Sequence, residues 1–532
     1  MRGGAGAGIR PALLRSLWAL PVGAVCVLGW APHGLPWVAV LAHAILFALL
    51  VRTRSVVETA WTAALFGLGL HALGSGWVLE PMVALAQMPI HMAWAGMALL
   101  LLYLSAFSAL SGLLFAWVLP PATLWTHRHL GLHGMLALAV FAASMTLGEY
   151  LRSLPFNGYT VLSLGYVLVD TPARGLFPAG GTYLASLWAY AIAGLLGWLA
   201  LDLGQGRGLQ ALRWPALSGA VLAGLMLALQ SVSWVQPSGS PLSFRLIQGN
   251  VRQADKFRPE TLEGQVRDYL QVITAERADL IVTPETAFPL FLNQLPVGTL
   301  ERLKQFSNRS DSHVFLGIGT VSALGHGHNS VIGISPGADL LQHYNKIRLM
   351  PFGEYSPRGL SWFSRQLVLP MKGMTPGLPD PRPFLVRSGR GGEPSLLGTL
   401  NCHEDMQGSD LRHWLPQAQI LLNPTNLAWF EGSRALGQRL QMAQARALEA
   451  GRPVLRVANT GVSAHIDHLG RIHESAAEGV AAVVTGEVQG MQGRTPYSRF
   501  GDVWPVALVF ALLLIGRLRT RRQRHAPTGR PA

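Results

Sequence analysis

The sequence predicts two structural classes in one chain: a polytopic α-helical membrane domain and an α/β domain. Half of the 532 residues are hydrophobic, 13% are charged and the mean hydropathy is +0.31, whereas a soluble protein carries about a quarter charged residues. Charge is scarce in the first part and again near the C-terminus. We therefore expect a multi-span membrane domain over residues 1–235, a globular domain over 236–495, and a final span with a basic cytoplasmic tail over 496–532.

Seven apolar segments fill the first part, each bounded by turn or charged residues. Most are long enough for a hydrocarbon core that takes about 20 helical residues to cross, although the second is short. The first follows Arg10 and Arg15 as a signal peptide would, but further apolar segments come at once, so we interpret it as an uncleaved span. The segments are residues 12–30, 35–51, 57–79, 91–119, 133–151, 179–201 and 213–233.

Basic residues predict the orientation of these spans, because loops rich in arginine stay in the cytoplasm. Seven spans that start inside deliver residues 236–495 to the outside. A shorter apolar run, Val503–Ile515, is followed by further arginines and so returns the chain to the cytoplasm. Topology thus explains the net charge of +14; no basic face with interleaved aromatic residues indicates nucleic acid. The arginines are Arg2, Arg10, Arg15, Arg52, Arg54, Arg128, Arg207, Arg213, Arg517, Arg519, Arg521, Arg522 and Arg524.

Strand-like and helical patterns alternate in the middle of the chain, which is typical of a layered α/β domain. The expected strands are Phe244–Val251, Leu280–Pro284, Val314–Val321, Ser330–Ser335, Ser395–Cys402, Ile420–Asn423, Val454–Asn459 and Ala481–Glu487. The expected helices are Thr261–Glu276, Thr299–Asn308 and Arg434–Glu449.

Polar residues follow three of these elements. Cys402 ends a strand, and the only other cysteine, Cys26, lies in the first apolar segment, so no disulfide framework explains it. A buried free thiol is the structural alternative. A nucleophilic thiol needs a base and a group that stabilises the oxyanion. Glu285 after a strand and Lys346 after a probable hairpin fit these needs, although either alone is typical of a protein surface.

Glu285, Lys346 and Cys402, in this order and in these contexts, resemble the nitrilase (carbon–nitrogen hydrolase) superfamily. With spans on both sides, the chain resembles the apolipoprotein N-acyltransferase family. This resemblance implies an α-β-β-α sandwich that faces the periplasm from the bacterial inner membrane. The matching stretches are Gly29-Trp-Ala-Pro32, Gly74-Ser-Gly-Trp77, Glu149-Tyr-Leu-Arg152, Gln248-Gly-Asn250, Thr283-Pro-Glu-Thr286, Tyr344-Asn-Lys346, Pro351-Phe-Gly-Glu-Tyr355, Asn401-Cys-His-Glu404, Gly451-Arg-Pro453 and Thr495-Pro-Tyr497.

The resemblance also implies residue roles. Glu285 would be the general base, Lys346 the electrophilic support and Cys402 the nucleophile. Glu354 and Glu404 match supporting carboxylates. We expect Glu354 to hold Lys346 or Glu285, while a structural ion pair is an equal alternative for Glu404.

Three positions depart from the family pattern. His403 stands where tyrosine is usual, Phe257 near a usual tryptophan, and Leu427 in place of aspartate. We interpret His403 as a packing change within the supporting group. We expect Phe257 and Trp429 to contact substrate, and the departures to affect lipid or acceptor preference.

The implied activity moves an acyl chain from a phospholipid donor, through a thioester, to the α-amine of a diacylated apolipoprotein. No metal or organic cofactor is expected. A membrane-anchored amidase or thioesterase and a non-catalytic membrane scaffold are the alternatives. Transfer of the proton from a thiol of pKa ~8.5 to a carboxylate of pKa ~4.3 costs about 6 kcal/mol. We therefore expect burial to raise the pKa of Glu285 and Lys346 to stabilise the thiolate.

Overall fold

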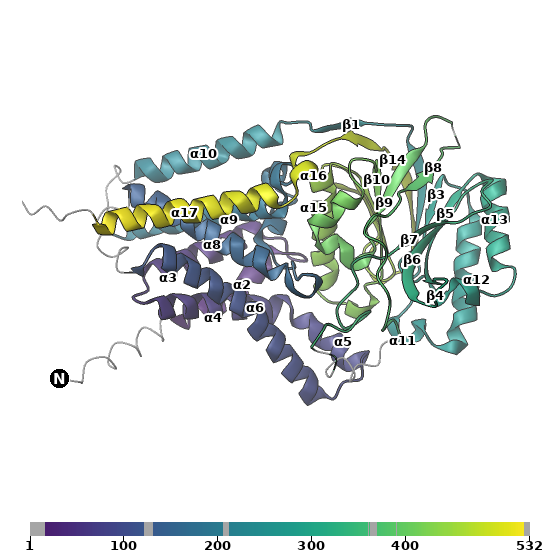
Figure 1. The fold of residues 1–532 in the computed structure, drawn as a ribbon, viewed down its shortest axis with the longest axis horizontal. Helices are drawn as coiled ribbons and strands as arrows, with labels where there is room; N and C mark the ends of the chain where they lie inside the picture. Colours follow the sequence, from purple (N-terminus) through teal and green to yellow (C-terminus); the bar gives the residue numbers. More distant parts are fainter. Residues whose placement is uncertain are drawn as a thin grey trace, which may run out of the picture.

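The computed structural model describes residues 16–121, 131–205, 212–359, 361, 370–389 and 391–525. The start of the first predicted span, five of the predicted topology arginines (Arg2, Arg10, Arg15, Arg128 and Arg207) and the end of the basic tail lie outside these residues. The described chain forms a bundle of apolar helices on the left of Figure 1 and a layered α/β part on the right.

A helix occupies every predicted apolar segment. Among the described residues, five helices are long and apolar enough to cross a membrane: 56–74, 90–118, 134–152, 172–204 and 503–522. The segments 19–29 and 36–51 form shorter apolar helices. The helices are α2 (Ala19–Cys26) with η1 (Val27–Gly29), α3 (Pro36–Val51), α4 (Val56–Gly74), α5 (Leu79–Ala84), α6 (Ile90–Val118), α8 (Gly131–Arg152), α9 (Leu176–Gly204), α10 (Arg213–Gln230), α16 (Pro496–Phe500) and α17 (Val503–His525).

Small residues let the membrane helices approach closely, as is common in helix packing within lipid. A Cβ atom on Gly69 of α4 would lie 2.0 Å from the carbonyl oxygen of Leu20 in α2. A Cβ atom on Gly112 of α6 would lie 2.8 Å from the carbonyl oxygen of Thr59 in α4. The final helix α17 returns along α8 and α9 (Figure 1), and Trp504 donates to the carbonyl oxygen of Ala179 at 2.9 Å.

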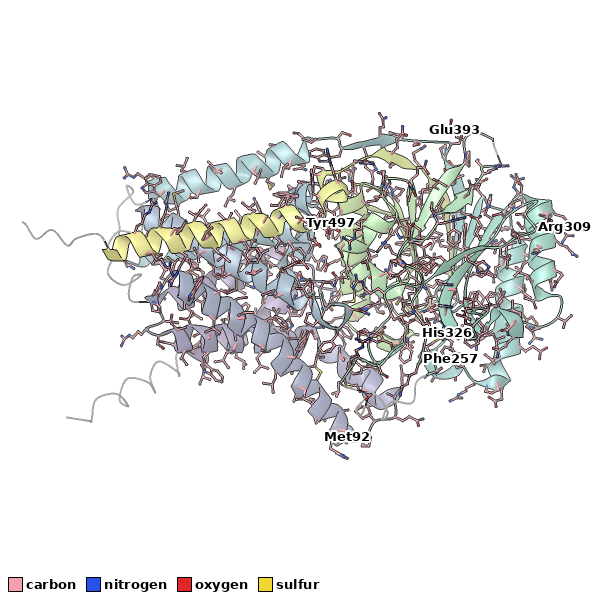
Figure 2. The ribbon with its side chains drawn as sticks, in the orientation of Figure 1. Met92, Phe257, Arg309, His326, Glu393 and Tyr497 are labelled. Atoms are coloured by element: carbon pink, nitrogen blue, oxygen red, sulfur yellow. The ribbon has the colours of Figure 1, made fainter. Side chains whose placement is uncertain are left out.

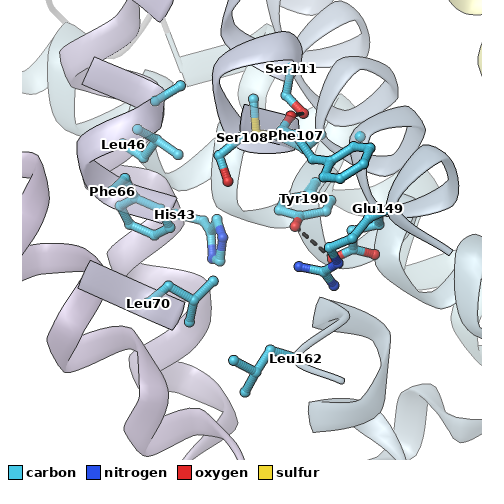
Figure 3. A pocket seen from close by; sticks show the side chains of 14 residues that line it. His43, Leu46, Phe66, Leu70, Phe107, Ser108, Ser111, Glu149, Leu162 and Tyr190 are labelled. Carbon is cyan, nitrogen blue, oxygen red and sulfur yellow. Dashed lines mark hydrogen bonds between the residues drawn. The ribbon is translucent and has the colours of Figure 1, made fainter. Parts of the chain in front are cut away.

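A polar cavity of about 40 Å³ lies inside the helical bundle (Figure 3). Its lining includes His43 and the two charged residues of the Glu149-Tyr-Leu-Arg152 motif. Oε1 of Glu149 accepts hydrogen bonds from the Tyr190 hydroxyl and the backbone N–H of Leu164, both at 2.7 Å. Arg152 donates to the carbonyl oxygens of Tyr159 and Val161. The motif therefore holds the segment 153–171 against the bundle.

Two sheets stack in the α/β part. The larger has the order β14-β2-β3-β5-β6-β7, with β4 beside β5, and the smaller β13-β12-β11-β10-β9-β8. The strands are β1 (Val235–Pro237), β2 (Leu242–Gln248), β3 (Leu280–Val282), β4 (Phe288–Phe291), β5 (His313–Val321), β6 (Gly327–Ile334), β7 (Gln342–Asn345), β8 (Phe384–Val386), β9 (Ser395–Thr399), β10 (Ile420–Thr425), β11 (Val454–Ala458), β12 (Ala464–Ile466), β13 (Ile472–Ser475), β14 (Ala482–Val488) and β15 (Met491–Gly493).

Alternating side chains build the layers, because successive strand residues point to opposite faces of a sheet. Leu246 and Val282 enter the core shared with the second sheet, whereas Ile247 and Ile281 enter the core beneath the outer helices. Helices α12 (Pro259–Ala275) and α13 (Thr299–Ser310) cover the larger sheet, and α15 (Ala435–Ala450) lies between the smaller sheet and the membrane helices (Figure 1). The predicted α-β-β-α sandwich on a polytopic helical part is confirmed.

Candidate active site

The structure brings Glu285, Lys346 and Cys402 together. Glu285 follows β3 and Lys346 follows β7 of the larger sheet, while Cys402 begins the 3₁₀ helix η8 (Cys402–Met406) after β9 of the smaller sheet. Nζ of Lys346 lies 2.9 Å from Oε1 of Glu285, and the Cys402 thiol lies near enough to the Glu285 carboxylate to lower the pKa of Glu285. All three side chains are buried. An acid, an amine and a thiol are therefore buried together between the sheets.

A second carboxylate and an amide complete the surroundings of the ammonium group. Nζ of Lys346 also lies 2.9 Å from Oε2 of Glu354. The Asn329 amide donates to Oε1 of Glu285 at 2.7 Å and to Oε1 of Glu354 at 2.6 Å. Glu354 thus contacts Lys346 directly and is joined to Glu285 through Asn329, which fits the positioning expected of it.

Two backbone contacts fix the position of the Glu285 carboxylate. The backbone N–H of Asn426 donates to Oε2 of Glu285 at 3.0 Å. Strand β5 passes behind Glu285 at Gly317, where a Cβ atom would lie 2.1 Å from the carbonyl oxygen of Pro284. Since no larger residue fits that contact, Gly317 lets the two segments pack and sets the depth at which the carboxylate lies.

Cys402 has a strained backbone. The predicted strand runs to Cys402, but β9 ends at Thr399, and Cys402 has a φ of 49°, in the left-handed region that non-glycine residues rarely adopt. Arg439 of α15 donates to the carbonyl oxygen of Cys402 at 2.7 Å. Asp405 holds Arg439 at 2.5 Å and Arg456 at 3.0 Å. A buried ion cluster therefore fixes the turn that presents the thiol.

The pKa of Glu285 lies below its usual value, whereas burial was expected to raise it. Burial and the nearby Glu285 carboxylate raise the pKa of the Cys402 thiol to about 11, although Lys346 and Arg439 oppose the shift. Burial also acts to raise the pKa of Glu285, but the Lys346 charge and hydrogen bonds from Lys346, Cys402 and Asn329 outweigh it and lower that pKa below its usual value. The two carboxylates outweigh burial and raise the pKa of Lys346. The resting site thus holds a thiol, a carboxylate and an ammonium group.

Glu404 does not take part in an ion pair with the described residues. Its carboxylate accepts hydrogen bonds from the Tyr344 hydroxyl at 2.7 Å, from the backbone N–H of Asn401 at 2.6 Å and from that of Ile347 at 2.7 Å. Glu404 therefore ties the segment that carries Cys402 to the segment that carries Lys346. His403 is buried, and its Nε2 has no hydrogen-bond partner within the described chain.

Phe257 and Trp429 are both half-buried. Phe257, labelled in Figure 2, follows α11 (Gln253–Lys256), and Trp429 lies in η10 (Ala428–Phe430). Both segments are joined to the site, because Asn426 contacts Glu285 and also donates to Oε1 of Gln253 at 2.9 Å. The positions suit contact with a substrate that approaches Cys402.

The turn that carries the thiol rests on the membrane part. The Thr160 hydroxyl donates to the carbonyl oxygen of Met406 at 2.7 Å, and the Gln407 amide donates to that of Ser153 at 3.1 Å. Both partners belong to the segment 153–171. Deeper in this junction, Tyr497, labelled in Figure 2, donates to Asp502 at 2.9 Å. Cys402 is thus attached to the helical bundle within a few residues along the chain.

Sequence patterns missed three residues of this site: Asn329, Arg439 and Lys256. Asn329 and Arg439 are single polar residues within a strand and a helix, and no motif marks them. Lys256 precedes Phe257, so its place beside an expected substrate contact was the available signal. Across the described ranges, no group of three or more His, Cys, Asp or Glu residues is arranged to hold a metal ion.

Comparison with known proteins defines the class. A carbon–nitrogen hydrolase family model matches residues 245–497, and a model of the apolipoprotein N-acyltransferase N-terminal domain matches residues 22–195. The chain therefore joins a carbon–nitrogen hydrolase fold to a multi-pass membrane part of the bacterial inner membrane.

Relatives cover nearly the whole chain. An apolipoprotein N-acyltransferase from Ralstonia nicotianae is 33% identical over 96% of this chain and 95% of its own, and one from Methylococcus capsulatus is 34% identical over 96% and 97%. Among solved structures, an amidase from Nesterenkonia sp. is 17% identical with a TM-score of 0.35, covering 52% of this chain and 98% of that one. The chain belongs to the apolipoprotein N-acyltransferase family, which confirms the resemblance seen in its motifs.

Proposed function

We propose that this protein transfers an acyl chain from a phospholipid to the α-amine of a diacylglyceryl-cysteine at a lipoprotein N-terminus, through a thioester on Cys402. The observation that carries the proposal is a buried thiol whose pKa is shifted by both the Glu285 carboxylate and the Lys346 ammonium group, which pair at 2.9 Å, on a turn that rests against membrane helices. The relatives named above bear the name of this activity.

In the first half-reaction, sulfur bonds to the ester carbonyl carbon as the thiol proton passes to Glu285. Lys346 stabilises the oxyanion. Collapse breaks the ester C–O bond, and the leaving glycerol oxygen takes the proton from Glu285, which releases a lysophospholipid. The pKa of the thiol is about 11, more than six units above the ordinary carboxyl value of 4.5. Transfer of the thiol proton to a carboxylate of ordinary pKa therefore costs about 9 kcal/mol. Proton transfer and attack are therefore concerted, with no stable thiolate beforehand.

In the second half-reaction, the lipoprotein amine attacks the thioester carbonyl. Lys346 again stabilises the oxyanion, the C–S bond breaks, and Glu285 carries a proton from nitrogen to the departing sulfur. Both substrates are anchored in lipid. A site attached to the membrane part suits them because it removes the need to extract either one from the bilayer.

The orientation is part of the proposal. Arg213 begins α10 and Arg517 to Arg522 end α17, at the ends of these helices away from the α/β part (Figure 1). Because basic ends of membrane spans stay in the cytoplasm, we infer that the α/β part faces the periplasm. To test this, cysteine is introduced in separate variants at exposed Val297 and Arg521. A membrane-impermeant maleimide should label only the first in intact spheroplasts; the reverse result contradicts the orientation.

The activity is tested by incubating the full-length protein with phospholipid vesicles and then with a diacylated lipopeptide. Mass spectrometry should find an acyl adduct on Cys402 that hydroxylamine removes, no adduct in Glu285→Gln, and a triacylated peptide after the second addition. An adduct that decays only to free fatty acid supports a hydrolase instead. Full lipoprotein maturation in cells that carry only Cys402→Ala supports a non-catalytic scaffold.

A further inference from the structure

A second lysine is buried against the backbone of Glu285, and no step above uses it. Lys256 ends α11 and is 1% exposed. Its Nζ donates to the backbone carbonyl oxygen of Glu285 at 3.2 Å. The backbone around Lys256 is fixed in turn, because the Gln265 amide of α12 donates to its carbonyl oxygen at 3.2 Å. The amine is therefore held in a defined position against the backbone of Glu285.

The two buried lysines have different partners. Lys346 lies within 2.9 Å of two carboxylates. Among the residues that the structure describes, no carboxylate lies within ion-pair distance of Lys256, and its Nζ contacts a neutral oxygen. An ammonium group buried in that way costs several kcal/mol, so the neutral amine is favoured.

The charged groups around Lys256 agree with this assignment. Glu285, from the segment after β3, and Cys402, from η8, act on the amine, whereas Gln265 on α12 is neutral. Both acidic groups raise the pKa of Lys256, but burial outweighs them and lowers it to about 7. The group can therefore exchange a proton near neutral pH, which is where general acid–base catalysis is most effective.

The proton balance of the second half-reaction calls for such a group. An α-amine of pKa about 7.7–8.0 is mostly protonated at pH 7. When R–NH₃⁺ becomes an amide N–H and the thioester becomes a thiol, nitrogen loses two protons and sulfur gains one. Glu285 carries the proton that reaches sulfur, so one proton remains. The first half-reaction leaves no such excess, because the thiol proton departs with the lysophospholipid.

We propose that Lys256 accepts this remaining proton and thereby converts the incoming α-ammonium group of the lipoprotein into a nucleophile. The assignment rests on the function proposed above and adds a residue for its second step. Lys256 takes the proton from the substrate nitrogen before attack, and the Lys256 ammonium group then releases it to water.

The test separates the two half-reactions. Full-length protein is first loaded with phospholipid, and the Cys402 adduct is measured. It is then chased with the diacylated lipopeptide at pH 7 and at pH 9, and with hydroxylamine, a nucleophile that is already neutral, at pH 7. Lys256→Met removes the proton acceptor. Lys256→Arg keeps a hydrogen-bond donor for the Glu285 carbonyl but cannot release its proton. Lys304→Met is the control, because that lysine also donates to a backbone carbonyl oxygen, of Asp339 at 3.0 Å, outside the site.

At pH 7 only about one tenth of an α-amine of pKa ~8 is neutral, whereas at pH 9 about nine tenths is. Both Lys256 variants should therefore form the adduct and react with hydroxylamine at the wild-type rate. Their transfer to lipopeptide should be about tenfold slower at pH 7 and within about twofold of wild type at pH 9. Lys304→Met should match wild type throughout.

Other outcomes overturn the proposal. Equal losses at both pH values, or full activity of Lys256→Arg at pH 7, would show that Lys256 only positions Glu285. If neither variant folds, the pH dependence of the wild-type transfer rate tests the proposal instead. A wild-type rate that rises tenfold from pH 7 to pH 9, in step with the fraction of neutral α-amine, means that no residue accepts the proton. Absence of the Cys402 adduct in wild type refutes the proposed function itself, and with it this assignment, whereas a normal adduct with unaffected transfer refutes only the role of Lys256.

Discussion

Replacement of Arg439 by glutamine is expected to slow formation of the thioester by about 10- to 100-fold. Arg439 donates to the carbonyl oxygen of Cys402, whose φ of 49° is an unfavourable backbone conformation. Such strain costs about 1–3 kcal/mol and persists only where neighbouring groups enforce it. A charge-assisted hydrogen bond contributes about 1.5–3 kcal/mol. Loss of the bond lets the turn relax, and 1–3 kcal/mol corresponds to about 5- to 150-fold in the population of the reactive conformer.

The stability of the variant should change less than its rate. Asp405 keeps its ion pair with Arg456 at 3.0 Å, so the substitution leaves no isolated buried carboxylate. The appropriate assay is the rate at which the Cys402 adduct appears after mixing with phospholipid vesicles. A second readout is the pH profile of thiol alkylation, which should move upward because the Arg439 charge lowers the thiol pKa.

Arg446→Gln is the matched control. Arg446 is buried on the same helix, but it pairs with Glu449 at 2.8 Å and contacts the membrane part through Thr182. It should lower thermal stability without moving the alkylation profile. The reasoning is wrong if Arg439→Gln acylates at the wild-type rate, or if both variants lose rate in proportion to their loss of stability.

Three further predictions concern the carboxylates. Glu285→Gln removes the base and should slow thioester formation by about 10²–10⁴-fold in the same assay, with Glu487→Gln on β14 as a remote control. Asn329→Leu removes the amide donor shared by two buried carboxylates, which then keep only Lys346 as a common partner, and it should lower the free energy of unfolding by about 2 kcal/mol or more. Asn308→Ala, at a surface amide that accepts from the backbone N–H of Gly337, should lower the free energy of unfolding much less. The folded-state pKa of Glu285 lies below the usual 4.5, so its pairing stabilises the fold above that pH and is lost as the pH falls through the folded value. The melting temperature of wild type should therefore fall more steeply below pH 4.5 than that of Glu285→Gln, and parallel curves would contradict this.

Local patterns predicted the elements well because each carries its own signal. The strands before Glu285 and Cys402 are short apolar runs, and α15 begins one residue from its predicted start at Arg434. Short strands such as β8 and β12 have three residues each and escaped prediction, because so few residues show no periodic pattern.

The sequence alone could not predict the surroundings of Glu285 or the backbone strain at Cys402, because both depend on residues that are distant along the chain. The expected rise in the pKa of Glu285 considered burial alone. The structure surrounds that carboxylate with Lys346, Asn329 and the backbone N–H of Asn426, which come from three separate segments. No sequence spacing reveals that convergence. The strain at Cys402 was missed for the same reason, because Arg439 lies 37 residues away along the chain.

The attachment of Cys402 to the membrane part connects the two architectures of the chain at the proposed site. The Glu149-Tyr-Leu-Arg152 motif holds segment 153–171 within the bundle, and that segment receives and donates hydrogen bonds at Met406 and Gln407, directly after the thiol turn. Helix α15 adds two further contacts: Arg439 donates to the carbonyl oxygen of Cys402, and Arg446 donates to the Thr182 hydroxyl on α9. The turn that carries the thiol is therefore tied to the helical part and to α15 at once. In the proposed reaction, this attachment would supply the proximity that an acyl transfer between two lipid-anchored substrates requires.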